Sequence, residues 1–298
     1  MKNNKLDQFY TNPKVTDYLV KKIHSMFNLE QYKIFEPAAG TGNFIDSLYK
    51  IGLNINEKCY AFDIEPKNNN FIKKADFLKL KINKYITNKN NNLVITNPPF
   101  GKRGNLAIEF INKSLEFADI VCMILPNTFN RYLVQKRIKE SAKLIYSEYL
   151  PENSFIVKDR EYSVKCSFQI WTNKNVQTWL SDKRLRNNNV QKIKGLELFI
   201  HNNTKETLKY FDKEFYNWNF AIVRQGYYDY SKKITNPDEL KRNRQYIFIK
   251  TENPYLLKLI EEIDFEALAS KNTVVKGFSN TDLIGEIYKL HINKILKF

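Results

Sequence analysis

The sequence predicts an α/β fold, in which a mostly parallel sheet carries helices on both faces and a smaller α+β region follows toward the C-terminus. Three observations predict it. Short apolar runs typical of buried strands alternate with segments of helical apolar spacing from residue 7 to residue 173. The last two apolar runs, 143–150 and 162–172, flank a polar connector at 151–161, which predicts a closing antiparallel pair. The composition changes beyond residue 175, so we expect two domains, 1–175 and 176–298.

The elements of the first domain follow one another regularly. Apolar residues at helical spacing predict a helix after Pro13, with Thr11 as a plausible N-cap. Apolar or β-branched runs predict strands at 33–36, 58–63, 71–76, 93–95 and 119–125. A helix is predicted at 107–118, with Ile108, Ile111 and Leu115 facing inward, and a polar helix at 131–142. This alternation of strand and helix is what parallel strands with crossover helices require.

The stretch from Leu93 to Phe100 (Leu-Val-Ile-Thr-Asn-Pro-Pro-Phe) ends a buried strand with two prolines, which exclude a helix. Asn97 therefore stands at the carboxyl end of a strand, where open α/β sheets hold their ligands. The Asn97 amide oxygen and the Pro98 carbonyl are adjacent acceptors, which suit a planar amino group with two hydrogens, and Phe100 offers a face for stacking. A Pro-Pro turn with an incidental asparagine is the alternative interpretation.

Two other strand ends carry candidate ligand-binding residues. The turn Gly40-Thr41-Gly42 lets the backbone pass close to a ligand, but its spacing indicates no pyrophosphate site. Asp63 ends the next strand roughly twenty residues later, where such folds bind ribose hydroxyls. An acidic residue that is merely exposed at the end of a strand, with no ligand, would give the same sequence pattern. Asp76, followed by Phe77, is a weaker candidate for an adenine amino group.

The charge balance favours a polyanionic partner. Lys and Arg number 48 against 32 Asp and Glu, which gives a formal net charge of +16. Nucleic acid is the first candidate and an anionic membrane surface the second. A proteome rich in lysine and asparagine would produce the same excess. Hydrophobic residues make up 43% of the chain, so a sizeable core is expected.

The cysteines and histidines predict no metal site and no disulfide framework. Cys59, Cys122 and Cys166 lie far apart in apolar runs, and the three histidines are equally scattered. No apolar run approaches transmembrane length, and no apolar leader follows Met1. We therefore expect a soluble, cytoplasmic protein that does not enter a membrane. The sequence leaves open whether the chain forms a homo-oligomer or binds a partner subunit.

The second domain is basic and rich in aromatic residues. Lysine and arginine are frequent in 176–194, and 216–230 is dense in tyrosine, phenylalanine and tryptophan. A strand is predicted at 246–249, and amphipathic helices at 254–268 and 280–296. Basic residues interleaved with aromatic ones suit phosphate contact and base stacking. A folded accessory domain with a solvated basic face explains the same residues.

Taken together, these motifs resemble the class I S-adenosylmethionine-dependent methyltransferases, which have a Rossmann-like seven-stranded sheet. Within them, the chain looks like the adenine-N6 branch, and the motif order is similar to the γ-type DNA adenine methyltransferases of restriction-modification systems. The resemblance rests on five blocks in order: Gln8-Phe9-Tyr10-Thr11-Asn12-Pro13, Phe35-Glu36-Pro37-Ala38-Ala39-Gly40-Thr41-Gly42-Asn43-Phe44, Phe62-Asp63-Ile64-Glu65-Pro66, Ala75-Asp76-Phe77-Leu78 and Asn97-Pro98-Pro99-Phe100.

The resemblance implies a role for each matching position. The cofactor S-adenosylmethionine would be bound by Thr11, Glu36, Pro37, Ala38, Gly40, Gly42, Asp63, Ile64, Asp76, Phe77 and Asn97. The catalytic motif would be Asn97, Pro98, Pro99 and Phe100. The substrate would be contacted by Phe100, by Lys102 and Arg103 in the following basic loop, and by Phe155 as a second stacking aromatic.

The sequence thus predicts methyl transfer to the N6 amino group of adenine in DNA, with the base flipped out of the helix. The target nitrogen is a poor nucleophile, so two acceptors on its hydrogens would help it attack, and no strong base is required. The alternatives are an RNA adenine methyltransferase, because Phe100 also occurs in rRNA-directed relatives, a protein-glutamine methyltransferase, and a non-catalytic nucleic-acid-binding subunit.

Overall fold

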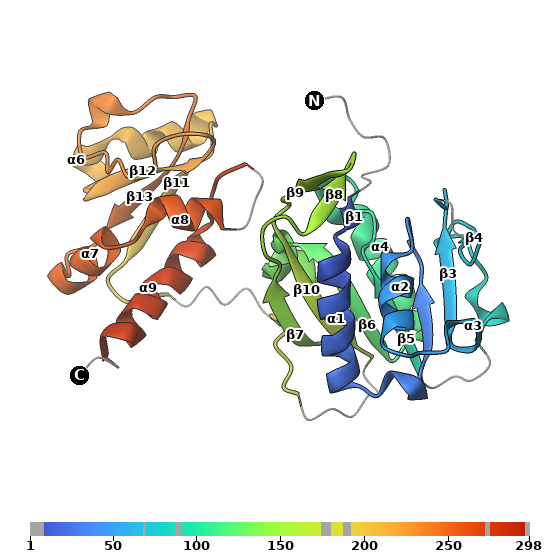
Figure 1. Cartoon of the computed structure of the whole chain (residues 1–298). Helices are drawn as coiled ribbons and strands as arrows, with labels where there is room; N and C mark the ends of the chain where they lie inside the picture. The colour runs from blue at the N-terminus through green and yellow to red at the C-terminus, as the bar shows by residue number, and fades with distance from the viewer. Residues whose placement is uncertain are drawn as a thin grey trace. The chain divides into compact units, whose positions relative to one another are not determined.

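The computed structural model describes residues 9–67, 70–86, 91–173, 180–186, 192–271 and 275–295, with side chains described as far as residue 292. The chain forms two compact units, residues 1–187 and 188–298 (Figure 1). Residues 180–186 belong to the first unit, although they follow the boundary expected after residue 175. The basic stretch 176–194 lies partly outside the described residues.

The first unit is built on the predicted seven-stranded, mostly parallel sheet, which is confirmed. Its strand order is β4-β3-β2-β5-β6-β10-β7. The strands are β2 (Lys33–Glu36), β3 (Cys59–Asp63), β4 (Lys73–Lys74), β5 (Asn92–Thr96), β6 (Ile120–Pro126), β7 (Lys143–Tyr149) and β10 (Cys166–Thr172). Five of them run in parallel from β4 to β6, while β10 pairs antiparallel with both β6 and β7. The last strand is therefore inserted beside β6 instead of closing the edge.

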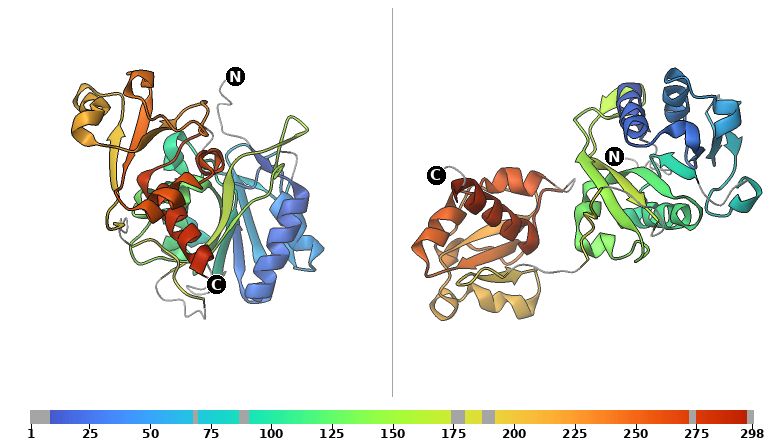
Figure 2. Two further views of the ribbon diagram at one scale, coloured as in Figure 1. Left: turned by 90° about the vertical axis from the view of Figure 1, so that its left-hand side faces the viewer. Right: turned by 90° about the horizontal axis from the view of Figure 1, so that it is seen from below.

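Helices cover both faces of this sheet, as predicted. The helices α1 (Pro13–Met26) and α2 (Asn43–Lys50) lie on one face, and α4 (Asn105–Phe117) lies on the other (Figure 2). Side chains alternate between the faces along each strand. Ile34 packs in the cluster with α1 and α2, whereas Phe35 packs in the cluster with α4. The three cysteines are free and buried.

The connector expected at 151–161 is a β-hairpin, which corrects the prediction. Strands β8 (Phe155–Val157) and β9 (Arg160–Tyr162) pair with each other, and β8 also pairs with β1 (Tyr10–Thr11). Because Thr11 lies in β1, it does not cap α1. The Asn12 side chain caps that helix instead by accepting from the Lys14 amide at 3.0 Å.

Several other elements are shorter than predicted, among them β10, which begins at Cys166 and not at residue 162. Strand β4 has two residues, so Asp76 lies beyond its end, and α5 (Tyr132–Gln135) is the helix described within the predicted range 131–142. The short helix α3 (Ile55–Lys58) precedes β3. In the second unit, the range 254–268 holds two helices, because Asp264 begins a new one by accepting from the Ala267 amide.

The second unit is α+β. A three-stranded antiparallel sheet, β11-β13-β12, contains β11 (Glu197–His201), β12 (Phe220–Gln225) and β13 (Gln245–Lys250). Its helices are α6 (Lys213–Tyr216), α7 (Pro254–Glu261), α8 (Phe265–Ser270) and α9 (Asn280–Ile295). Much of the aromatic stretch 216–230 is core, since Trp218, Phe220 and Tyr230 are buried. Tyr227, by contrast, is 70% exposed. None of the helices described in either unit is long and apolar enough to cross a membrane.

Candidate functional site

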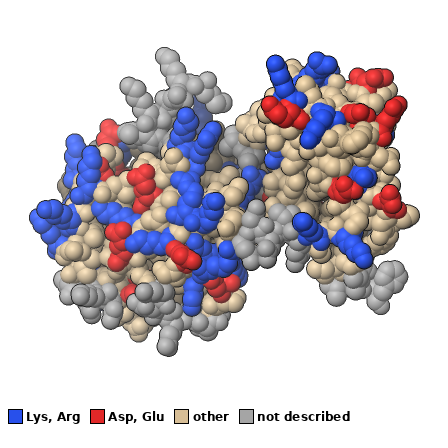
Figure 3. Space-filling model, turned by 180° about the vertical axis from the view of Figure 1, so that it is seen from behind, with Lys and Arg blue, Asp and Glu red and all other residues tan. Residues whose placement is uncertain are grey.

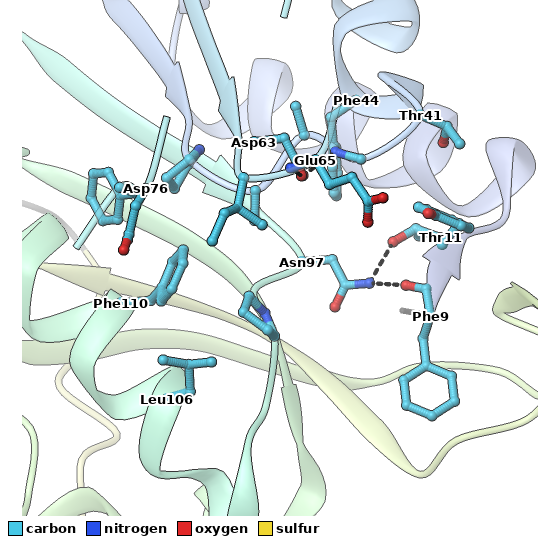
Figure 4. A pocket seen from close by; sticks show the side chains of 18 of the residues that line it. Phe9, Thr11, Thr41, Phe44, Asp63, Glu65, Asp76, Asn97, Leu106 and Phe110 are labelled. Atoms are coloured by element: carbon cyan, nitrogen blue, oxygen red, sulfur yellow. Dashed lines mark hydrogen bonds between the residues drawn. The ribbon is translucent and has the colours of Figure 1, made fainter. Parts of the chain in front are cut away.

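A cavity of about 510 Å³ opens at the carboxyl ends of β2, β3 and β5 in the first unit (Figure 4). These three strands are neighbours in the sheet, so the polar residues that follow them are brought to one place. The segment that carries β1 and the start of α4 complete the wall. Parallel α/β sheets hold ligands at this edge, which makes the cavity the candidate site.

The glycine turn and Asp63 form one wall. Gly40 and Gly42 have φ values of +53° and +91°, and Gly42 begins α2. A Cβ at Gly40 would lie 2.9 Å from the Tyr10 ring, so the close approach of β1 requires glycine there. The Gly40 amide donates to Asp63 Oδ2 at 2.7 Å, and the Glu65 amide donates to Oδ1 at 2.8 Å. These bonds fix the Asp63 carboxylate at the cavity wall.

Asn97 is held in a defined orientation at the centre of the site. Its Nδ2 donates to the Phe9 carbonyl at 2.7 Å and to Thr11 Oγ1 at 3.1 Å (Figure 4). A carbonyl only accepts, so the Phe9 contact identifies the amide nitrogen. Asn97 Oδ1 is buried and has no hydrogen-bond partner among the described residues. The side chain therefore presents a bare acceptor beside the cavity.

Glu36 lies beneath this wall, outside the cavity lining. It is 1% exposed, and its Oε1 accepts from the Ala38 amide at 3.3 Å. Its Oε2 has no hydrogen-bond partner among the residues that the structure describes. Burial, assisted by the negative charge of Asp63, raises the pKa of Glu36 to about 8. The carboxyl is therefore protonated at neutral pH in the folded chain.

Asp76 and Phe77 line the cavity on the side of β3 and β4. Asp76 Oδ1 accepts from the Leu78 amide at 3.0 Å, which orients the carboxylate. Phe77 is 2% exposed and packs against Phe110 at a centroid distance of 5.3 Å. A carboxylate beside an apolar wall of this kind suits the edge and face of an adenine ring.

The aromatic residues near the mouth form a row. Phe9 lies nearly parallel to Phe100, with centroids 6.4 Å apart, and nearly parallel to Tyr162, 5.7 Å away on β9. Tyr162 is 42% exposed. The sequence predicts Phe155 as the second stacking aromatic, and here the structure corrects it. The Phe155 ring is fully buried in the core beneath α1, edge-on to Phe9, and has no free face.

The structure brings most predicted site residues to the cavity. Those that line it are Thr11, Pro37, Ala38, Gly40, Asp63, Ile64, Asp76, Phe77, Asn97, Pro99 and Lys102. Those that lie outside the lining are Glu36, Gly42, Pro98, Phe100, Arg103 and Phe155. Arg103 is exposed on the adjoining loop, and Phe100 is half-buried beneath Phe9. The roles inferred for these residues stay predictions.

Sequence reasoning missed several residues of the site. Glu65 lines the cavity two positions after Asp63, and its acidic side chain next to a strand-end acid was an available signal. Phe9 and Tyr162 were not predicted, because their contact depends on the pairing of β1 with the hairpin. That pairing joins segments more than 140 residues apart, at Tyr10 and Ile156, which local patterns cannot reveal.

Comparison with solved structures finds chains of similar fold. A modification subunit of a putative type I restriction enzyme from Vibrio vulnificus is 14% identical, with a TM-score of 0.42, over 56% of this chain and 45% of that one. A putative class I S-adenosylmethionine-dependent methyltransferase from Listeria monocytogenes is 15% identical, with a TM-score of 0.44, over 62% and 67%. Magnesium protoporphyrin IX methyltransferase from Synechocystis, solved with bound S-adenosylmethionine, is 11% identical, with a TM-score of 0.38, over 54% and 79%.

The cofactor predicted from the sequence, S-adenosylmethionine, is the one named for these methyltransferase neighbours. No protein with a curated description matches the sequence. The family model of the EDM2 methyltransferase-like domain matches residues 30–208, which is more than half of the chain and includes β2, β3, β5 and the residues that follow them. The chain therefore belongs to the EDM2 methyltransferase-like domain family.

Proposed function

We propose that this protein transfers a methyl group from S-adenosylmethionine to the N6 amino group of adenine in DNA. The observation that carries the proposal is Asn97, whose Nδ2 is anchored by Phe9 and Thr11 while its buried Oδ1 has no described partner. An unsatisfied buried acceptor costs stability, so its retention suggests a donor that arrives with the substrate. An exocyclic amino group is such a donor.

The residues around the cavity fit the cofactor. Asp63, oriented by the Gly40 and Glu65 amides, still has lone pairs for the two ribose hydroxyls. Asp76 and Phe77 suit the amino edge and the face of the adenine ring. The glycine turn lines the cavity with backbone that has no side chain at Gly40, which suits the methionine part of the cofactor. When bound, S-adenosylmethionine supplies an electrophilic methyl group.

Asn97 acts on the target nitrogen. Its Oδ1 accepts one N–H, and the neighbouring Pro98 carbonyl is the second acceptor predicted from the sequence. Holding both hydrogens draws the nitrogen lone pair out of conjugation with the ring and stabilises the positive charge that develops during transfer. Since the Asn97 amide is already oriented, no reorganisation is needed at that moment. A base in a duplex reaches this depth only after it flips out of the stack.

The rest of the chain supports a nucleic-acid substrate. The net charge of +16 favours a polyanion, and Phe9 in the cavity wall, stacked with the exposed Tyr162 at 5.7 Å, provides aromatic surface beside the cavity. DNA is preferred because the order of the motifs is similar to that of the DNA enzymes. RNA is the second candidate, favoured by phenylalanine at position 100.

The test is transfer of labelled methyl groups to unmethylated genomic DNA and to total RNA in parallel, followed by digestion to nucleosides. Label in N6-methyladenine from DNA is expected. Label in RNA alone would show that the substrate is RNA and not DNA. Label in neither polymer would refute the proposal. The variant Asn97→Ala should lose at least about a hundredfold in turnover but still bind S-adenosylmethionine in calorimetry. Asn54→Ala, at an exposed asparagine without a side-chain capping bond, is the matched control.

A further inference from the structure

The loop after the Asn-Pro-Pro-Phe motif has an unusual backbone that displays two cations. Gly101, Arg103 and Gly104 have φ values of +67°, +57° and +73°. A Cβ at Gly101 would lie 2.7 Å from Leu106 Cβ, and one at Gly104 would lie 3.0 Å from the Phe129 ring. The loop is thus pressed against the wall of the site, and Lys102 and Arg103 are both exposed. A non-glycine residue in the left-handed region is strained, which often marks a functional position.

A second pair of cations, Lys136 and Arg137, comes from a different part of the chain and adjoins Lys102 and Arg103. Arg137 Nη2 donates to Asn105 Oδ1 at 2.9 Å, and Asn105 begins α4 directly after the loop. The Arg137 carbonyl in turn accepts from Asn112 Nδ2, about two turns further along the same helix. Lys136 and Arg137 are exposed. We call Lys102, Arg103, Lys136 and Arg137 the basic strip.

Few acidic residues offset this strip. Figure 3 shows the side of the first unit away from the viewer of Figure 1, where lysine and arginine outnumber acidic side chains. On α4 the exposed acids are Glu109 and Glu116, and Glu116 is paired with Lys139 at 3.2 Å. On the opposite face, Lys22 and Lys50 of α1 and α2 are paired with Glu148 and Asp17, while Lys21 of α1 is exposed.

We propose that the basic strip binds the sugar-phosphate backbone of the nucleic acid next to the target nucleotide. Lys102 lines the cavity, so the strip begins where a flipped nucleotide would enter and continues over the N-terminal end of α4. Arginine forks and lysine ammonium groups are the usual phosphate contacts, and they position the strand without reading its sequence. This inference rests on the proposed function, since it assigns the partner of the same site.

The experiment uses the full chain and the double variant Lys136→Gln/Arg137→Gln, which leaves the cavity lining intact. Binding to fluorescent 20-nucleotide single-stranded DNA, duplex DNA and single-stranded RNA is measured by anisotropy at several salt concentrations. The variant should bind about tenfold more weakly, with a salt slope smaller by about 2 because two phosphate contacts are removed. The same loss is expected on whichever of the three polymers the wild-type chain binds best.

The control is Lys21→Gln/Lys58→Gln, which removes two cations of α1 and α3 and should leave affinity and slope unchanged. An unchanged thermal unfolding midpoint shows that the loss of the exposed Arg137–Asn105 bond has not disturbed the fold. The strip is refuted if its variant binds like the wild type, or if both double variants weaken binding equally. Failure of the proposed function gives a different result. In that case the chain would transfer no methyl group, but its binding to nucleic acid would still depend on the basic strip.

Discussion

Replacing Glu36 by glutamine is expected to remove a pH-dependent loss of stability. The Glu36 carboxyl is fully buried under the site, and burial raises its pKa to about 8, from an ordinary value of 4.5. In the unfolded chain this carboxyl ionises near 4.5, whereas in the folded chain it keeps its proton until about pH 8. Between these two values, unfolding releases a proton.

The sign and size of the effect follow from this difference. The folded state holds more protons than the unfolded state, so the free energy of unfolding falls as the pH rises. The stabilising contribution is complete below the unfolded pKa and is lost as the pH rises through the folded pKa. Each pH unit in this window is worth about 1.4 kcal/mol. From about pH 5.5 to about pH 7.5, wild type should therefore lose roughly 2 to 3 kcal/mol relative to Glu36→Gln.

The assay is urea unfolding of both proteins at several pH values, followed by circular dichroism. The glutamine amide itself changes the free energy of unfolding by an amount that does not vary with pH. The quantity to compare is therefore the slope of the free energy of unfolding against pH. Glu30→Gln, at an exposed glutamate, should keep the wild-type slope. Parallel pH profiles for wild type and Glu36→Gln would show that Glu36 is ionised in the folded protein, and the reasoning would be wrong.

Two other substitutions test the contacts that hold the site and the unit together. Thr11→Val removes the hydroxyl that accepts from Asn97 at 3.1 Å, so kcat should fall roughly five- to tenfold. Thr11→Ser keeps the hydroxyl and should keep the wild-type kcat. If Thr11→Val lowered only the affinity for the cofactor, Thr11 would not position Asn97. Arg184→Met should lower the free energy of unfolding by about 3 kcal/mol, because Arg184 is only 8% exposed and its guanidinium donates to five backbone carbonyls at 2.5–3.1 Å. Arg160 is exposed, so the control Arg160→Met should change the free energy of unfolding by less than about 0.5 kcal/mol in the same urea titration. Equal effects of the two variants would show that the bonds of Arg184 do not stabilise the fold.

The parts of the fold that the sequence predicts correctly are those with strong local signals. Buried parallel strands appear as continuous apolar runs, and β2, β3, β5 and β6 are all of this kind. Each ends in residues that break the run, so local patterns are enough to locate the carboxyl edge of the sheet, and with it Gly40, Asp63 and Asn97. The cavity lining contains all three.

The parts that it misses depend on partners distant in the chain. Strand β9 is the polar triplet Arg160–Tyr162, and strand β8, although apolar, has only the three residues Phe155–Val157, which is too short for a strand signal inside a polar connector. Arg184 looked like one more cation in a basic stretch, yet its carbonyl contacts, and the bond from the Lys183 amide to the Leu144 carbonyl at 2.7 Å, attach 182–186 to the first unit. Those contacts explain why the first unit extends past residue 175.

The β8–β9 hairpin, which the sequence did not predict, also affects the orientation of Asn97. The orientation of Asn97 depends on the Phe9 carbonyl and the Thr11 hydroxyl, and both belong to the segment that holds β1. That segment is kept in place by its pairing with β8 and by the bond from the Asn12 amide to the Ser154 carbonyl at 2.9 Å. If β1 separated from the hairpin, the Asn97 amide would be free to rotate, and its acceptor would no longer face the site. The bonds from the Gly40 and Glu65 amides to the Asp63 carboxylate do not involve β1, although the glycine turn would lose the Tyr10 ring beside Gly40 and the bond from Asn43 Nδ2 to the Thr11 carbonyl at 2.7 Å. Both side-chain hydrogen bonds of Asn97 go to the β1 segment, whereas the Asp63 carboxylate is oriented by amides outside it, so a change in the hairpin should reduce turnover more than it reduces affinity for S-adenosylmethionine.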